Sequence, residues 1–266
     1  MSIKRIFIGI IMVVTLASCG TEFKLAKSFT EQSQNTRVAV FFPEMAQVTL
    51  VQDKEGNYSK VLDSLNQNMF LDIVYAAYAD ALRHNGLDVY IPDDPDRVQV
   101  DSTHWLVILS KMEIQGMHTE YVDHLFDFLN EYDYSFSLNT VNVASWFDVN
   151  DGEWHPTLFD EYNLRDDFRS YVTRSRENGT QYHYEITPLK ADDIYNYAVF
   201  LGKRYAELTY DHMMNHSIET ALAKKNIFPR FKLHWNPGEK TYEFLLEGEG
   251  FIELVPDSQS PSSSQL

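Results

Sequence analysis

An apolar segment near the amino terminus limits what the start of this 266-residue chain can become. Residues 6–16 are almost entirely apolar, and the basic side chains of Lys4 and Arg5 precede them. This segment is too short to cross a bilayer as a helix, which needs about 20 residues. A basic start, a short apolar run and small residues after it are typical of a cleaved export signal. Residues 1–18 therefore predict a signal peptide that is separate from the folded domain.

The only cysteine of the chain follows this segment directly. The sequence Leu16-Ala17-Ser18-Cys19 resembles the lipobox of bacterial lipoproteins in its residues and in its position. The resemblance implies cleavage before Cys19 and attachment of acyl chains such as palmitate to Cys19, which then anchor the protein in a membrane. The alternative interpretation is a buried first strand or helix that ends in a chance cysteine. A chain without a second thiol also suits the oxidising periplasm, because no other cysteine can mispair there.

The residues after Cys19 carry the expectation about location. In lipoproteins of this kind, an aspartate directly after the cysteine retains the protein in the inner membrane, and this chain has Gly20 there. Surface-export signals use several acids at this point, whereas Glu22 stands alone. The resemblance therefore implies an outer-membrane lipoprotein on the periplasmic face rather than the cell surface. The polar residues 19–36 are expected to form a lipidated tether.

Composition excludes several classes of function. Asp and Glu number 39 against 22 Lys and Arg, which gives a net charge of −17. An acidic chain repels phosphate backbones, so nucleic acid is not an expected partner. A hydrophobic fraction of 44%, with 17 Phe and 16 Tyr, is enough for a folded core. A single cysteine excludes a disulfide framework and a multi-cysteine metal site.

Hydrophobic periodicity predicts two long helices and several strands. The helices are expected at residues 59–85 and 191–225. Four strands are expected before the turn Asn150-Asp151-Gly152, and the last of them has room for a bulge; they span 37–43, 87–91, 105–114 and 132–149. The other expected segments are a connection at 44–58, a returning strand within 153–172, a polar loop at 173–181, and a hairpin made by 231–235 and 241–246.

This order predicts an α+β fold, in which two long helices pack on one face of a mixed β-sheet and a β-hairpin follows at the carboxyl end. Residues 37–255 are expected to form one domain, elaborated after residue 150, and the serine-rich residues 256–266 a disordered tail. Over residues 37–150 the order resembles small periplasmic lipoprotein domains. These include the amino-terminal domain of TolB, the lipoprotein activators of peptidoglycan synthases and the auxiliary lipoproteins of ABC-type lipid transport. The resemblance implies partner binding rather than catalysis.

His212 and His216 lie one turn apart on the second predicted helix, a spacing that can hold zinc. Glu207 or Asp211 could add a carboxylate. Met213, however, stands where a zinc peptidase of this pattern needs its general-base glutamate, so that class of hydrolase is excluded. The favoured interpretation is two ordinary histidines at the helix surface or the edge of the core.

Residues 148–152 resemble the start of a calcium loop, but Gly152 comes one position early and Phe159 replaces the required glutamate. A hairpin turn is the better interpretation. Clusters of acids could bind cations loosely or lie on solvated loops; they are Asp93/Asp94/Asp96, Asp160/Glu161 and Asp166/Asp167. The sequence has no nucleophile elbow and no glycine-rich phosphate loop. We therefore expect no catalytic residue, no cofactor and no resident metal.

Four aromatic residues between positions 146 and 171 could form a platform for sugar stacking, although cross-strand pairs are the more common use; they are Trp146, Trp154, Tyr162 and Tyr171. The leading hypothesis is a non-enzymatic, outer-membrane-anchored lipoprotein that serves as a binding or assembly accessory to an envelope complex. An acidic body favours a basic protein partner. The alternative is a glycan-binding or glycan-processing lipoprotein of the surface or periplasm.

Overall fold

The computed structural model describes residues 20–127, 130–153, 155–175 and 179–254. The predicted signal peptide, Cys19 and the predicted tail at 256–266 lie outside the described residues, as does Trp154. Among the helices that are described, none is long and apolar enough to cross a membrane.

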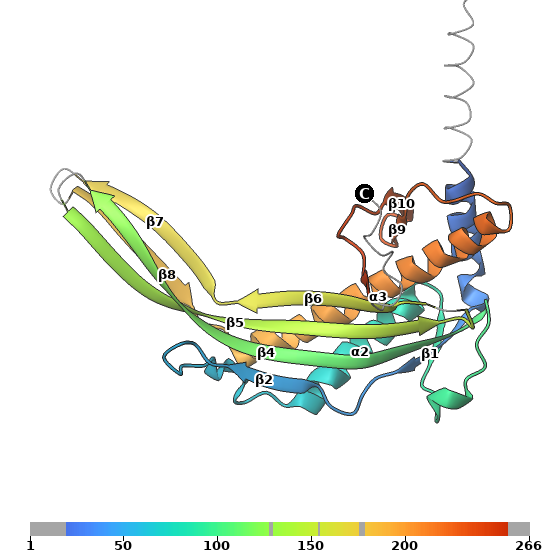
Figure 1. The fold of residues 1–266 in the computed structure, drawn as a ribbon, viewed down its shortest axis with the longest axis horizontal. Coiled ribbons are helices and arrows are strands. Elements are labelled where there is room, and N and C mark those ends of the chain that lie inside the picture. The colour runs from blue at the N-terminus through green and yellow to red at the C-terminus, as the bar shows by residue number, and fades with distance from the viewer. Residues whose placement is uncertain (1–19, 128–129, 154, 176–178, 255–266) are drawn as a thin grey trace, which may run out of the picture.

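The described strands form one large mixed sheet and two small antiparallel pairs (Figure 1). The central path of the large sheet is β11 (Ile252–Leu254), β6 (Thr157–Arg165), β5 (Asn130–Asn150), β4 (His104–Asp127), β1 (Arg37–Phe41) and β3 (Asp88–Tyr90). The strand β2 (Gln47–Val51) pairs with β4 beside this path. β1 is parallel to β3 and β4, and β2 is parallel to β4, whereas the pairs β4–β5, β5–β6 and β6–β11 are antiparallel.

Two long helices, α2 (Gln67–His84) and α3 (Ala191–Ala223), pack on one face of this sheet (Figure 1). The predicted hairpin is present as β9 (Leu233–Asn236) and β10 (Thr241–Phe244). The predicted α+β class and this arrangement are therefore confirmed. The first helix begins later than expected, because Asn66 caps α2 by accepting a hydrogen bond from the backbone N–H of Met69. Short 3₁₀ turns cover Ser33–Asn35, Lys60–Leu62 and Pro95–Arg97.

A bulge in β4 explains the pattern of its apolar residues. Leu109 pairs with Phe147 and Lys111 pairs with Trp146, so Ser110 is the extra residue. The bulge shifts the inward-facing positions of β4 by one residue, so the buried residue that follows Leu109 is Met112 rather than Lys111. A bulge was expected in residues 132–149, but the structure has it in the partner strand.

Five strands were not predicted as such or were expected to be shorter. β4 continues well past its expected end at residue 114, as far as Asp127, and β5 begins two residues earlier than expected, at Asn130. The expected connection at 44–58 contains β2, and the expected loop at 173–181 contains the facing ends of β7 (Asp167–Ser175) and β8 (Gly179–Thr187). β7 and β8 form a hairpin that lies along the extension of β4 and β5 (Figure 1). We call the four segments that project together, β4 after Met117, β5 before Thr140, β7 and β8, the arm.

The prediction of a polar tether at 19–36 is wrong for the residues that the structure describes, because residues 20–32 form a helix. Its buried residue Ala26 belongs to a small hydrophobic cluster at the end of α3, and the Phe23 ring lies 6.2 Å from that of Phe231. The other buried members of this cluster are Met214, Ile218, Leu222 and Leu233. Phe23, Ala26 and Phe29 recur every three residues, a helical spacing that the polar residues between them hide. The buried carboxylate of Glu22 also accepts the backbone N–H of Arg230 at 2.9 Å.

A glycine sets the distance between the two long helices. A Cβ atom added to Gly202 of α3 would collide with the backbone oxygen of Val74 and lie 2.8 Å from the Cβ atom of Ala77, both in α2. The absence of a side chain therefore permits this close contact.

We predict that Gly202→Ala lowers the free energy of unfolding by about 1–3 kcal/mol, because the overpacked helices must separate. Denaturant unfolding measures this change. Gly238→Ala is the control, because its Cβ atom would meet only the Asn236 side chain, at 3.4 Å. Equal stability of both variants would contradict the packing described.

Candidate functional site

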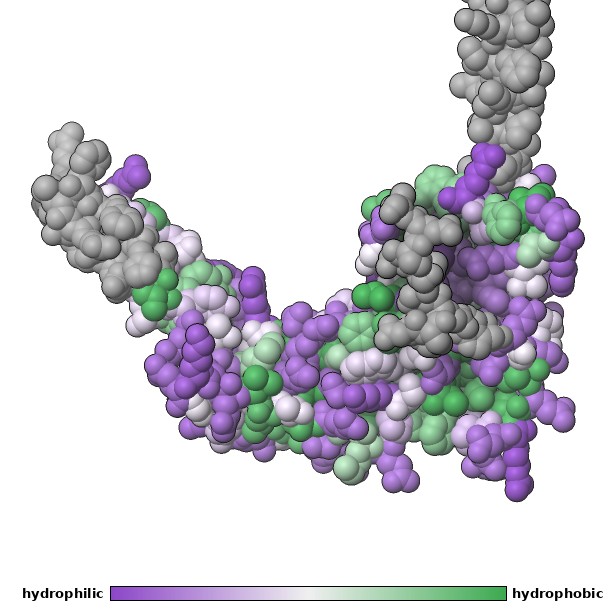
Figure 2. Space-filling view, viewed as in Figure 1, coloured by the Kyte–Doolittle hydropathy of each residue, from purple (hydrophilic) through white to green (hydrophobic). Residues whose placement is uncertain are grey.

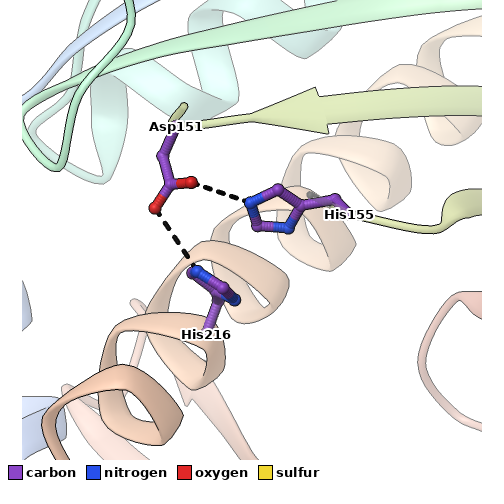
Figure 3. Close-up of side chains that lie close together, drawn as sticks. All are labelled: Asp151, His155 and His216. Carbon is purple, nitrogen blue, oxygen red and sulfur yellow. Dashed lines mark hydrogen bonds and ion pairs between the residues drawn. The ribbon is translucent and has the colours of Figure 1, made fainter. Parts of the chain in front are cut away.

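A cluster of two histidines and one aspartate joins the turn between β5 and β6 to α3 (Figure 3). Asp151 and His155 come from the turn, and His216 comes from the helix. Oδ1 of Asp151 lies 2.8 Å from Nε2 of His155, and Oδ2 of Asp151 lies 3.4 Å from Nε2 of His216. One ligand atom from each residue lies within 4.8 Å of the other two.

The turn places Asp151 through its own backbone. Gly152 has a φ of 96°, and its N–H donates to the side-chain oxygen of Asn150 at 2.7 Å. Oδ1 of Asp151 accepts the N–H of Glu153 at 3.1 Å in addition to the contact with His155. The predicted turn at 150–152 therefore orients the carboxylate toward the helix.

The electrostatics of the cluster favour an ionised Asp151 and a neutral His216. Burial raises the pKa of Asp151, but the hydrogen bonds from His155 and Glu153 outweigh it and the net pKa is lowered. Burial lowers the pKa of His216, and the neighbouring His155 lowers it further. At neutral pH the ring nitrogen of His216 is therefore free of an extra proton and can donate its lone pair.

Two buried polar atoms beside the cluster have no hydrogen-bond partner within the described chain. They are Nε2 of His212 and Nε1 of Trp105. The Trp105 ring lies 5.8 Å from that of His155 and 5.9 Å from that of His216, and the His212 ring lies 5.6 Å from that of His155. Burial, followed by the two neighbouring histidines, lowers the pKa of His212 to about 3. A buried polar atom normally has a partner, so these two indicate space for a water or an ion.

Cavities lie on both sides of the cluster. One, of about 670 Å³, is lined by His155, His212 and His216 together with residues of the carboxyl-terminal segment such as Lys232 and Phe251. The other, of about 600 Å³, reaches His216, Asp151 and Glu153 from the side of the amino-terminal helix. A small solute could therefore approach the cluster.

The residues considered as possible zinc ligands, His212 and His216 with Glu207 or Asp211, are not brought together as one set. The rings of His212 and His216 are 6.5 Å apart, and His216 points to Asp151 rather than to its neighbour on the helix. Glu207 pairs with Arg204 at 3.5 Å. The Asp-x-x-x-His spacing of Asp151 and His155 was not singled out from the sequence. A predicted turn does not by itself indicate a metal site.

Asp211 and Asn215 fix the terminal hairpin to α3. Oδ2 of Asp211 lies 2.6 Å from Nδ1 of His234, and Oδ1 accepts the N–H of Trp235 at 2.9 Å. Asn215 bonds both the N–H and the carbonyl of Leu233, at 2.8 and 2.7 Å. The hydrogen bond to Asp211 raises the pKa of His234, and burial raises the pKa of Asp211. The raised pKa of His234 is the more important of the two shifts, because the Asp211 carboxylate also accepts the backbone N–H of Trp235, which stabilises its ionised form.

The predicted acidic clusters have structural uses. The buried Asp166 accepts the N–H of Asn139 at 2.7 Å and that of Leu189 at 2.8 Å, where the arm leaves the body. Asp94 caps a 3₁₀ turn by accepting the N–H of Asp96. Burial raises the pKa of Asp160 to about 6. The calcium interpretation of residues 148–152 is not supported, since Asp148 accepts the hydroxyl of Thr157 and Asp151 faces the histidines.

The alternative of an aromatic platform is not supported by the described residues among these four. Trp146 contacts Phe159 on the open face of the sheet, with ring centroids 5.1 Å apart. Tyr162 contacts Phe200 and Tyr205 on the helix-covered side. Tyr171 lies on the arm. These aromatic residues form cross-strand and core pairs instead.

Aromatic residues gather instead on the arm. Phe136 of β5 stacks on Phe168 of β7, with ring centroids 4.7 Å apart, and lies 5.6 Å from Tyr184 of β8. The opposite face of β7 and β8 is polar, and there Tyr171 donates to Glu185 while Thr173 contacts His183. Figure 2 shows apolar side chains on the arm interrupted by polar ones. The arm is thus a two-layer ribbon with a thin aromatic core.

We predict that Asp211→Asn lowers the pKa of His234, measured by NMR, because the carboxylate no longer stabilises the imidazolium. A histidine whose pKa is raised on folding contributes stability below its ordinary value of 6.5, and the contribution is lost as the pH rises through the raised pKa. The variant should therefore lose about 1.5–3 kcal/mol at acidic pH and less at alkaline pH.

Asp80→Asn is the control for this variant, because Asp80 forms an exposed pair with Arg83 at 3.3 Å and such pairs contribute little. A loss of stability in Asp211→Asn that is the same at every pH would contradict an ion pair.

Comparisons with known proteins give little guidance. No family model matches the chain, and no curated protein matches it either. One solved structure that is similar is described as a neuraminyllactose-binding hemagglutinin homolog from Helicobacter pylori. The identity is 12%, the alignment covers 71% of this chain and 90% of the other, and the TM-score is 0.34. A likeness at this level carries no argument about function.

Proposed function

We propose that this chain is a non-enzymatic lipoprotein, anchored in the outer membrane through acyl chains on Cys19, that binds a protein partner of the envelope along its arm. The observation that carries the proposal is the arm itself. It projects beyond the helices that cover the rest of the sheet (Figure 1). A projection with such a thin core gains little stability from its own packing, so its length favours a binding role.

The edges of the arm favour a protein partner. β2 pairs with β4 only as far as Met117, and β6 pairs with β5 only from Thr140 onward. Beyond these points the outer edges of β4 and β5 meet no further strand in the described parts of the chain. β7 and β8 form a separate two-stranded sheet, which also has two edges. Unpaired backbone groups at an edge accept an extended segment of another protein as an added strand.

Exposed apolar side chains lie beside these edges. Val122 in β4 is 56% exposed and Val172 in β7 is 48% exposed. Tyr121 and Tyr134 are also exposed, although each contacts an aromatic neighbour on one side. Apolar side chains at a free edge add specificity to the backbone pairing.

The direction of the arm supports a partner near the membrane. Residues 20–32 are docked on the body, so an anchor on Cys19 would be held close to it rather than on a free tether. The arm curves toward the side of the molecule on which the amino-terminal helix, drawn in blue, lies (Figure 1). A partner that is embedded in, or lies against, the same membrane would therefore meet the arm. The periplasmic face of that membrane is the proposed location.

We predict that Cys19→Ala abolishes incorporation of labelled palmitate and leaves an uncleaved precursor in cells. Mass spectrometry of the amino-terminal peptide checks the result. The Ser18→Ala variant is the control, since a small residue before the cysteine is retained. Palmitate labelling that persists in Cys19→Ala would contradict the anchor.

We predict that a photoreactive residue at position 122 or 172 crosslinks in living cells to one envelope protein, and that position 228 does not. Phe228 is the matched control, because its apolar side chain is 86% exposed and it follows the end of α3, outside the arm. The double variant Val122→Lys/Val172→Lys should reduce complex recovered by affinity purification by about tenfold, and Phe228→Lys should not.

Two outcomes would contradict this assignment. Equal crosslinking from positions 122 and 228 would show that the arm has no special role. Adducts with glycan alone, together with binding on a glycan array, would replace the proposal with the glycan-binding alternative.

A further inference from the structure

The geometry points to a binding site for one zinc-type divalent transition-metal ion between the β5–β6 turn and α3, with Asp151, His155 and His216 as ligands. We call these three residues the histidine cluster. The inference goes beyond the proposed function, because the cluster does not lie on the arm and does not depend on any partner.

The donor set selects the class of metal. Two imidazoles and one carboxylate suit zinc and neighbouring transition metals, whereas calcium and magnesium prefer sites made of oxygen alone. Such a combination, with a fourth position left for water or another carboxylate, is a recurrent zinc geometry.

The distances fit a tetrahedral ion. Zinc bonds of about 2.0–2.1 Å place neighbouring ligand atoms about 3.3 Å apart. Nε2 of His216 lies 3.4 Å from Oδ2 of Asp151 and 3.5 Å from Oε2 of Glu153. These separations are longer than the 2.8 Å contact of His155 with Asp151, which must open slightly as the ion replaces a proton. Glu153 has a side chain 61% exposed and is placed to take the fourth position.

The surroundings supply a second, independent observation. The indole N–H of Trp105 and Nε2 of His212 are buried, lie against the cluster, and have no hydrogen-bond partner in the part of the chain that the structure describes. Trp105 is only 1% exposed. A water on the ion would give such groups a partner, and groups behind the ligands are what hold a metal site in shape.

An ion could reach the histidine cluster from outside, and its binding would join two segments of the chain. The cavity that reaches Asp151, Glu153 and His216 gives it access from the side of the amino-terminal helix. Once bound, it would crosslink the turn after β5 to the last third of α3, two segments about 60 residues apart that already meet through the His155–His216 ring contact at 4.2 Å and the His216–Asp151 contact.

A second group of potential ligands serves as the internal comparison. Asp53, His118 and Glu120 also lie close together, but Asp53 already accepts the backbone N–H groups of Glu55 and Asn57 in a turn. This group has one imidazole and lies near the base of the arm. We therefore expect it to bind zinc more weakly.

The test uses the full-length protein in detergent, incubated with zinc and then passed through a desalting column. We expect one zinc per chain by elemental analysis, and a raised unfolding temperature that a chelator reverses. His155→Gln and His216→Gln should each weaken binding by more than about 100-fold, because they remove a direct ligand, and Glu153→Gln by about tenfold. His118→Gln should bind as the wild type does.

A readout on the wild type keeps the test independent of how the variants fold. X-ray absorption of the zinc-loaded protein should show two imidazole ligands and oxygen donors, and the cobalt-loaded protein should show the strong visible absorption of a tetrahedral ion. No retained metal, a shell of oxygen alone, or a loss of metal in His118→Gln with none in His216→Gln would overturn the inference.

Discussion

The antiparallel pairing of β4 with β5 is the interaction on which the rest of the structure depends. The ladder runs without interruption from Leu106 and Asn150 to Asp127 and Asn130, except for the bulge at Ser110. At the end of the ladder that contains Leu106 and Asn150, the two strands form the centre of the core and are covered by α2 and α3. At the other end the same two strands leave the helices behind and form the first layer of the arm. One pairing therefore provides both the stable body and the projecting surface, and the bulge corrects the register so that alternate residues of β4 still face the core.

The long helix α3 connects the regions to which this account assigns a role. Close to the start of α3, the buried carboxylate of Asp166 accepts the backbone N–H groups of Asn139 and Leu189. These hydrogen bonds fix the base of the arm relative to the helix. Further along, His216 meets the turn after β5, and Asn215 holds the terminal hairpin. The same stretch of helix receives the amino-terminal helix through Ala26. The amino-terminal helix, the candidate metal site and the terminal hairpin are thus gathered at one end of the molecule, with the arm at the other (Figure 1).

Sequence reasoning found the elements whose periodicity is long and regular. The two helices, the strand at 132–149 and the terminal hairpin are predicted because their patterns repeat within one segment. The helix at 20–32 was missed, because its buried residues are separated by lysines and glutamates that resemble a tether. β7 and β8 were missed in part, because they are exposed on one face and are stabilised by Phe136 from a remote strand. In the candidate site, His216 was found by its spacing on the helix, but its partners Asp151 and His155 come from a turn, and only the folded chain brings them together.

Amide hydrogen exchange tests the central claim most directly, by comparing the purified protein with the protein in its affinity-purified envelope complex. Strand addition to the arm predicts slower exchange in residues 118–122 and 134–139 and in one strand of the β7–β8 hairpin, with α2 and α3 unchanged. Unchanged exchange throughout the arm, together with protection of the terminal hairpin or of the sheet face near Trp146, would contradict the account and place the partner on the body of the protein.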